Sequence, residues 1–144
     1  SVGGVRAGRF DMAAVSRLFK PLRNRRFWMA LWAAAVLGVV VVCLIPPPPL
    51  PPLPDNSDKL EHFAAYFLLA AGAVQVFRRG RVLAWVGVAL VAQGVCIEFA
   101  QGALTATRSA DPFDALANAV GVAAGLATAF TPLCDLLLRL QPRR

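Results

Sequence analysis

The feature that most constrains this chain is a series of long apolar runs separated by short connections. The first run, residues 27–45, contains no charged side chain. About 20 apolar residues in a helix are enough to cross the ~30 Å hydrocarbon core of a bilayer. Because lipid offers no partners to bare backbone groups, each such run must be helical. We therefore predict an all-α, polytopic membrane protein.

Four such runs predict a four-transmembrane-helix bundle. Their approximate bounds are 27–45, 59–77, 82–104 and 112–133, which gives a membrane domain over 27–133. A proline tract, 46–54, separates the first two runs because proline cannot continue a helix. We expect this tract to be a stiff, extended outer connection, with a proline-rich ligand for a partner as the alternative.

The basic residues predict the orientation of the bundle. Thirteen of the 15 Lys and Arg residues lie in three segments, 1–26, 78–81 and 134–144. With an even number of spans these segments share one side, which the positive-inside rule places in the cytoplasm. We expect a multi-pass protein of the bacterial cytoplasmic (inner) membrane with both termini cytoplasmic. The net charge of +7 then reflects topology and implies no nucleic-acid partner.

The first segment, 1–26, and the cysteines have simpler interpretations. Apolar residues recur there at steps of three and four, which predicts a short basic amphipathic helix on the inner leaflet; the alternative is a solvated tail. These residues are Met12, Val15, Phe19 and Leu22. The segment 134–144 is expected to be a basic cytoplasmic tail. The three cysteines are widely spaced in apolar surroundings, which favours small buried hydrophobes over a disulfide or zinc site.

The unusual residues gather toward the expected outer side. Asp58 and His62 are four residues apart, on one helical face that Tyr66 extends. A histidine oriented by a carboxylate is typical of acid–base units and of metal ligands. Asp58 also suits a helix cap, with Glu61 as its capping-box partner.

A second polar pair lies inside the third apolar run. Glu98 and Gln101 are three residues apart and share a face. A carboxylate about two turns inside a span costs on the order of 2–3 kcal/mol on insertion scales. We therefore expect Glu98 to face the bundle interior, either as a functional group or as a structural ion pair with Arg108 or Lys59.

The third polar group begins the fourth run. Asp111 before Pro112 predicts a helix cap with proline at the first helical position. One stripe of the following helix carries polar residues and then a GxxxG close-packing motif. The stripe consists of Asp114, Asn118, Gly121 and Gly125. Its polar members should therefore point into the bundle, where we expect a shared outward-facing cavity. The residues expected to share it are His62, Glu98, Arg108 and Asp114.

These motifs, in this order and spacing, resemble the VanZ-like family of bacterial membrane proteins. The motifs are DKxxHFxxY from Asp58, ExxQ from Glu98, RxxD from Arg108 and DxxxNxxG from Asp114. The resemblance covers about 45–125, and the long basic start and the extended proline tract depart from it. It implies a cell-envelope protein, since the family takes its name from a member linked to glycopeptide resistance, in particular to teicoplanin.

Two functions are expected as alternatives. The protein binds a lipid-linked or amphiphilic envelope ligand among membrane lipids, or it is an intramembrane enzyme that modifies a lipid head group with His62 and Glu98 as acid–base. Catalytic residues would be His62, Glu98, Arg108 and Asp114. Ligand-binding residues would be Asp58, Lys59, Tyr66, Gln101, Arg108, Asp111 and Asn118. Arg108 is a candidate anion clamp.

No cofactor and no metal ligand set is assigned from the sequence. A metal-dependent form of the enzyme is a further alternative. A single histidine with carboxylates suits Mg²⁺ or Mn²⁺ better than zinc. Its ligands would come from His62, Glu98, Asp111 and Asp114. An oligomer stays open too.

Overall fold

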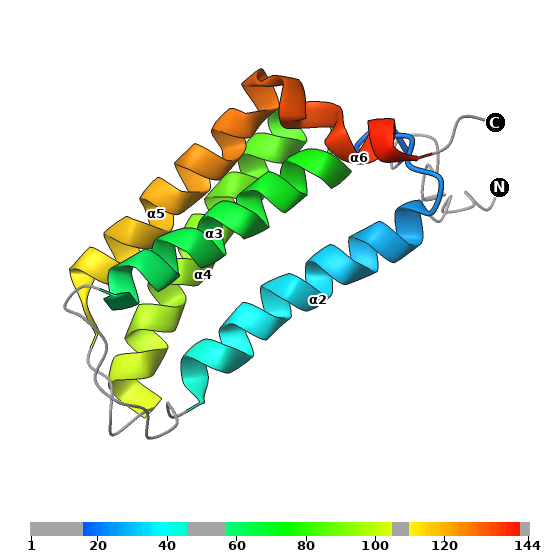
Figure 1. Cartoon of the computed structure of the whole chain (residues 1–144). Helices are drawn as coiled ribbons and strands as arrows, with labels where there is room; N and C mark the ends of the chain where they lie inside the picture. Colours follow the sequence, from blue (N-terminus) through cyan, green and yellow to red (C-terminus); the bar gives the residue numbers. More distant parts are fainter. Residues whose placement is uncertain (1–15, 46–56, 105–109, 142–144) are drawn as a thin grey trace, which may run out of the picture.

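The computed structural model describes residues 16–45, 57–104 and 110–141, and within these ranges the chain is mostly helical and contains no strand. The all-α class is therefore confirmed for this part of the chain. The elements are α2 (Arg25–Leu44), α3 (Ser57–Val76), α4 (Arg81–Leu104), α5 (Pro112–Ala127), the 3₁₀ turns η1 (Thr128–Phe130) and η2 (Pro132–Asp135), and α6 (Leu136–Leu140). Helices α3, α4 and α5 lie together, and α2 runs along them at a greater distance (Figure 1).

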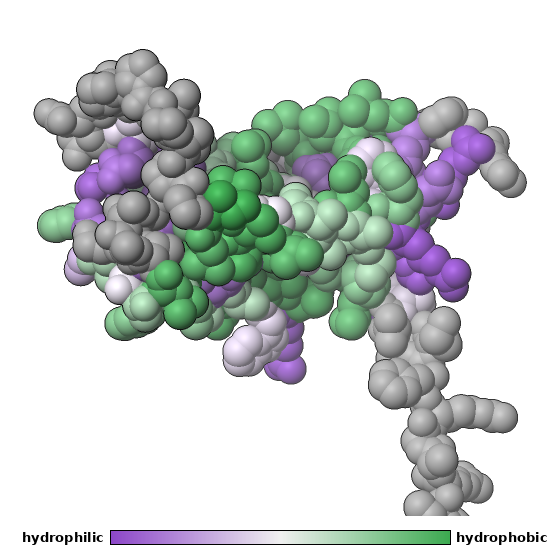
Figure 2. All heavy atoms as spheres, turned by 90° about the horizontal axis from the view of Figure 1, so that it is seen from below, coloured by the Kyte–Doolittle hydropathy of each residue, from purple (hydrophilic) through white to green (hydrophobic). Residues whose placement is uncertain are grey.

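Three of the described helices are long and apolar enough to cross a membrane. They are Arg25–Leu44, Arg81–Leu104 and the continuous helical stretch Pro112–Phe130. Helix α3 is as long as α2 but is less apolar, because Asp58, Lys59 and Glu61 occupy its first turns. On the face seen in Figure 2, apolar side chains cover most of the middle and hydrophilic ones gather mainly toward the two ends. These features suit a membrane protein.

The ends of the helices follow from proline. Helix α2 ends at Leu44, just before the proline tract. The fourth run, expected to continue to about 133, ends as a helix at Phe130. Thr131 is extended, with φ −111° and ψ 167°, because the following Pro132 disfavours a helical conformation in the residue before it.

The closest approach in the bundle is between α3 and α5. A Cβ atom on Gly121 would meet the backbone of Phe63, and one on Gly125 would lie 2.5 Å from the carbonyl oxygen of Phe67. Only glycine allows the two backbones to come this close. The predicted GxxxG packing face is thus confirmed, and it fixes the register in which α3 and α5 present their polar residues to each other.

Helix α2 is attached in a different way, because none of its residues is buried. Three hydrogen bonds from side chains to backbone carbonyls hold it along its length. Trp32 Nε1 donates to Leu69 O of α3 at 2.8 Å. From α4, Gln93 Nε2 donates to Val36 O at 3.3 Å and Gln101 Nε2 to Cys43 O at 2.9 Å. These polar tethers join α2 to the other helices, and Trp32, Val36 and Val39 pack partly buried against the hydrophobic core.

An amphipathic helix was predicted over 1–26, and residues 1–15 of it lie outside the described part of the chain. For residues 17–24 the prediction is wrong, because they contain no helix. Phe19 instead forms an isolated antiparallel bridge with Phe77, and Leu22 is buried. Pro21 explains the difference, because it pushes Lys20 out of the helical region. The Lys20 ammonium lies 2.8 Å from Asp135 Oδ1, so the start of the described chain is tied to the expected C-terminal tail.

Candidate functional site

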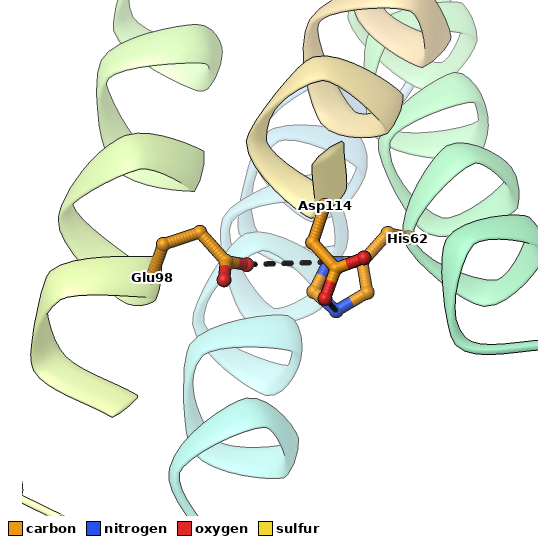
Figure 3. Close-up of side chains that lie close together, drawn as sticks. All are labelled: His62, Glu98 and Asp114. Carbon is orange, nitrogen blue, oxygen red and sulfur yellow. Dashed lines mark ion pairs between the residues drawn. The ribbon is translucent and has the colours of Figure 1, made fainter. Parts of the chain in front are cut away.

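One side chain from each of three helices meets at one end of the bundle, as Figure 3 shows. His62 Nδ1 on α3 lies 3.7 Å from Glu98 Oε1 on α4, and His62 Nε2 lies 3.9 Å from Asp114 Oδ2 on α5. One potential ligand atom from each residue lies within 4.8 Å of the others. The structure thus brings together three of the four residues expected to converge, and the fourth, Arg108, lies outside the described residues.

The cap of α5 sets the position of Asp114. Asp111 Oδ1 accepts a 2.8 Å hydrogen bond from Phe113 N, and Pro112 occupies the first turn. The expected cap is therefore confirmed. Asp114 follows in the same turn and is buried, with the residue 8% exposed. The stripe of α5 that packs on α3 consequently carries this carboxylate inward.

Asn118, one turn further along α5, orients the imidazole. Its Oδ1 lies 3.0 Å from His62 Nδ1, and the residue is only 1% exposed. An amide oxygen can only accept, so in this arrangement Nδ1 carries the proton. The lone pair of Nε2 is then free on the side of Asp114.

Lys59 is the cation of the cluster among the described residues. Its Nζ lies 3.2 Å from Asp111 Oδ2 and 3.5 Å from both Asp114 Oδ1 and Asp58 Oδ2. The hydrogen bond from Phe113 N and then that from Lys59 hold the pKa of Asp111 below its usual value. Lys59 pairs with the carboxylates of α5 rather than with Glu98, so the suggested pair between Lys59 and Glu98 is not among the described ion pairs.

Glu98 is the most deeply buried carboxylate of the cluster, at 4% exposure. Its Oε2 accepts a hydrogen bond of 3.3 Å from the backbone N–H of Asp111. Its Oε1 faces the imidazole and accepts no hydrogen bond within the part of the chain that the structure describes. The expectation that Glu98 faces the bundle interior is therefore confirmed.

The remaining predicted residues take different places. Tyr66 is 1% exposed and packs beside Gly94, with no hydrogen-bond partner for its hydroxyl among the described groups. Gln101 is buried but turns to the Cys43 carbonyl, so it tethers α2. Asp58, whose side chain is 56% exposed, stands at the rim beside Lys59.

A cavity of about 340 Å³ opens between α2 and α3 next to the cluster. Its polar residues are His62, Glu61 and Tyr66 on α3. Its other walls are made by Ala35, Gly38, Val39, Val42, Cys43 and Ala65. Glu98 and Asp114 do not line this cavity, and Arg108 lies outside the described residues, so a cavity shared by all four residues stays a prediction. His62 alone of the three converging residues reaches from the buried carboxylates to the cavity.

The contribution of α2 was missed from the sequence. The apolar run 27–45 carries no polar residue to mark a site. The one available signal was Gly38, a residue without a side chain among larger ones. In the structure, a Cβ atom on Gly38 would meet nothing within 4 Å, because this glycine faces the cavity.

Comparison with known proteins gives no match to a family model, to a curated protein or to a solved structure.

Proposed function

We propose that this chain is a VanZ-like protein of the bacterial inner membrane that binds a lipid-linked or amphiphilic ligand of the cell envelope. The apolar part of the ligand lies between α2 and α3, and its head group lies against His62 and Lys59. One observation carries the proposal. His62 lines a cavity with mainly apolar walls and at the same time contacts buried polar groups of α4 and α5.

The shape and chemistry of the cavity support an amphiphile. Its volume of about 340 Å³ falls at the lower end of the range typical of ligand sites. Its walls are small or aliphatic side chains of α2, and its polar residues belong to the first turns of α3. An apolar body joined to a polar end is the composition of a lipid, with the chain against α2 and the head near His62.

In the proposed topology α3 is also a span, the second of four, and both termini lie in the cytoplasm. Gly121 and Gly125 place α3 directly against α5, one of the three apolar helices. The polar cluster gathers the first turns of α3 and α5, whereas Arg78, Arg79 and Arg81 follow the other end of α3. This separation of charge suits the positive-inside rule, with the cluster at the outer leaflet.

A second function, an enzyme acting on a lipid head group, is favoured by the surroundings of His62. Its imidazole lies between two carboxylates and is oriented by Asn118, as a general base that activates water requires. In that case the bound amphiphile is the substrate, and turnover of the head group distinguishes the two functions. Arg108 is proposed to contact anionic groups of the ligand in either case.

Susceptibility to teicoplanin tests the proposal in cells. A strain that lacks this gene is complemented with the wild type, with His62→Ala or with Glu98→Gln, and membrane levels are compared by blot. Asp135→Asn is the matched control, because it also replaces a carboxylate by an amide but lies near the other end of α3. We expect the wild type and Asp135→Asn to lower susceptibility to teicoplanin. His62→Ala and Glu98→Gln should leave susceptibility at the level of the strain that lacks the gene. Equal susceptibility in all strains would contradict a role in resistance, and lipid profiling would then test for a modified head group.

A further inference from the structure

The polar cluster holds more buried negative charge than its described cations balance. Glu98 and Asp114 are 4% and 8% exposed, and Asp111 lies against both the Glu98 carboxylate and Lys59. Among the described residues, one lysine or arginine side chain contacts these carboxylates. It is Lys59, which pairs with Asp111 and Asp114. A buried carboxylate is protonated, paired with a positive charge or bound to a metal ion, because removing an ionised group from water is costly.

The distances around the imidazole suit ligands of an ion. The separations from the two ring nitrogens, 3.7 Å to Glu98 and 3.9 Å to Asp114, exceed the usual range of hydrogen bonds, ~2.7–3.2 Å. Two ligands on a cation with bonds of about 2.0–2.2 Å lie at most ~4.3 Å apart. The 3.9 Å between His62 Nε2 and Asp114 Oδ2 falls within that limit. One potential ligand atom from each of the three residues lies within 4.8 Å of the others. Glu98 Oε1 also faces the imidazole without a hydrogen bond of its own.

The groups behind the cluster orient it as partners of metal ligands do. Asn118 Oδ1 accepts a hydrogen bond from His62 Nδ1, which leaves the lone pair of Nε2 available to a metal ion. The backbone N–H of Asp111 fixes the outer oxygen of Glu98, and Oε1 is left pointing inward. Ligating histidines and carboxylates are commonly held by such hydrogen bonds from a second layer of residues.

We propose that His62, Glu98 and Asp114 bind one divalent cation. One imidazole nitrogen with two carboxylates suits an ion that accepts mixed nitrogen and oxygen ligands, such as Mn²⁺. A second acidic group, Asp58, Asp111 and Asp114, is more exposed, and the Lys59 ammonium lies within 3.5 Å of all three. That group is already neutralised in part, so the site with His62 is the one that takes the ion. This inference does not depend on the amphiphile.

Electron paramagnetic resonance with Mn²⁺ tests the site on the wild-type protein. The full chain is purified in detergent without a histidine tag, stripped with a chelator and titrated with Mn²⁺ at neutral pH. The sequence contains a single histidine, so nitrogen modulation from an imidazole on the bound Mn²⁺ identifies His62. We expect one Mn²⁺ per chain with this modulation. Absence of stoichiometric binding, or bound Mn²⁺ without imidazole nitrogen, overturns the proposal even if no variant folds.

Three variants then distinguish this site from the competing acidic group. His62→Gln and Glu98→Gln should weaken Mn²⁺ binding by about tenfold or more. Asp58→Asn, which removes a carboxylate of the competing group, should leave it unchanged. The opposite pattern, loss in Asp58→Asn with full binding in His62→Gln, places the ion at the competing group and overturns the assignment. Circular dichroism and gel filtration confirm that each variant retains its helices.

Discussion

Asn118 Oδ1 and His62 Nδ1 lie 3.0 Å apart, across the interface where α5 packs most closely on α3. The contact depends on the glycines that follow on α5. Because Gly121 and Gly125 let the two backbones approach, the short side chain of Asn118 reaches the imidazole directly. The packing motif and the chemistry of the site therefore belong to the same helix stripe.

The first prediction concerns the tautomer of His62. Since an amide oxygen accepts from Nδ1, we expect the Nδ1 proton in the wild type at neutral pH. Labelling with ¹⁵N-histidine gives a spectrum of this residue alone, because the sequence has one histidine. In Asn118→Leu the preference for Nδ1–H should disappear. A wild-type spectrum of the Nε2–H tautomer would contradict the arrangement.

The second prediction concerns the interface between α3 and α5. Gly121→Val places a side chain against the Phe63 backbone, which cannot move without shifting the helix. We expect a loss of about 1–3 kcal/mol in the free energy of unfolding, as is usual for overpacking. Unfolding in mixed micelles with increasing SDS measures the change. Gly38→Ala is the matched control, since a Cβ atom there meets nothing within 4 Å, and a comparable loss in this control would contradict the assignment.

The third prediction is a dependence on pH near the end of the bundle opposite the polar cluster. The hydrogen bond from Lys20 is the main cause that holds the pKa of Asp135 below its ordinary value of 3.8. A carboxyl group whose pKa is lower in the folded state stabilises that state fully above the unfolded pKa. This contribution is lost as pH falls through the lowered folded value. Hydrogen exchange of residues 131–141, corrected for intrinsic rates, should therefore show less protection below pH 3.8 than at pH 6.

Asp135→Asn provides the control for this pH effect. The variant cannot form the ion pair with Lys20, so its protection should already be low at pH 6 and should change little on acidification. If the wild type and the variant lose protection in parallel, the pH dependence has another origin.

The sequence was sufficient for the features that depend on local pattern. The apolar runs predicted the helices, and the spacing of Asp114, Asn118, Gly121 and Gly125 predicted which face of α5 points inward. The cap at Asp111 and the inward direction of Glu98 followed from the same kind of reasoning. These features hold in the structure because they depend on helical periodicity and on the cost of exposing charge to lipid.

Features that depend on contacts between distant segments could not be predicted in this way. Pro21 could have indicated that the helix fails there, but the bridge between Phe19 and Phe77, which are 58 positions apart in the chain, gave no local signal. The tethering of α2 by Gln93 and Gln101 gave no local signal, because α2 supplies only backbone carbonyls to these bonds. The cavity beside His62 likewise has walls from two helices, α2 and α3, which no local pattern brings together.

Photo-crosslinking with a lipid that carries a diazirine on its acyl chain tests the central claim most directly. The purified wild type is compared with Gly38→Leu, which fills the cavity. The control is Ala33→Leu, which adds the same side chain at an exposed position. Ala33 lies two residues before the cavity residue Ala35 and therefore on the roughly opposite face of α2. The account predicts labelling of the cavity walls in the wild type and in Ala33→Leu, and loss of most of it in Gly38→Leu. Undiminished labelling of these walls in Gly38→Leu, or labelling confined to the outward face of α2, would contradict it.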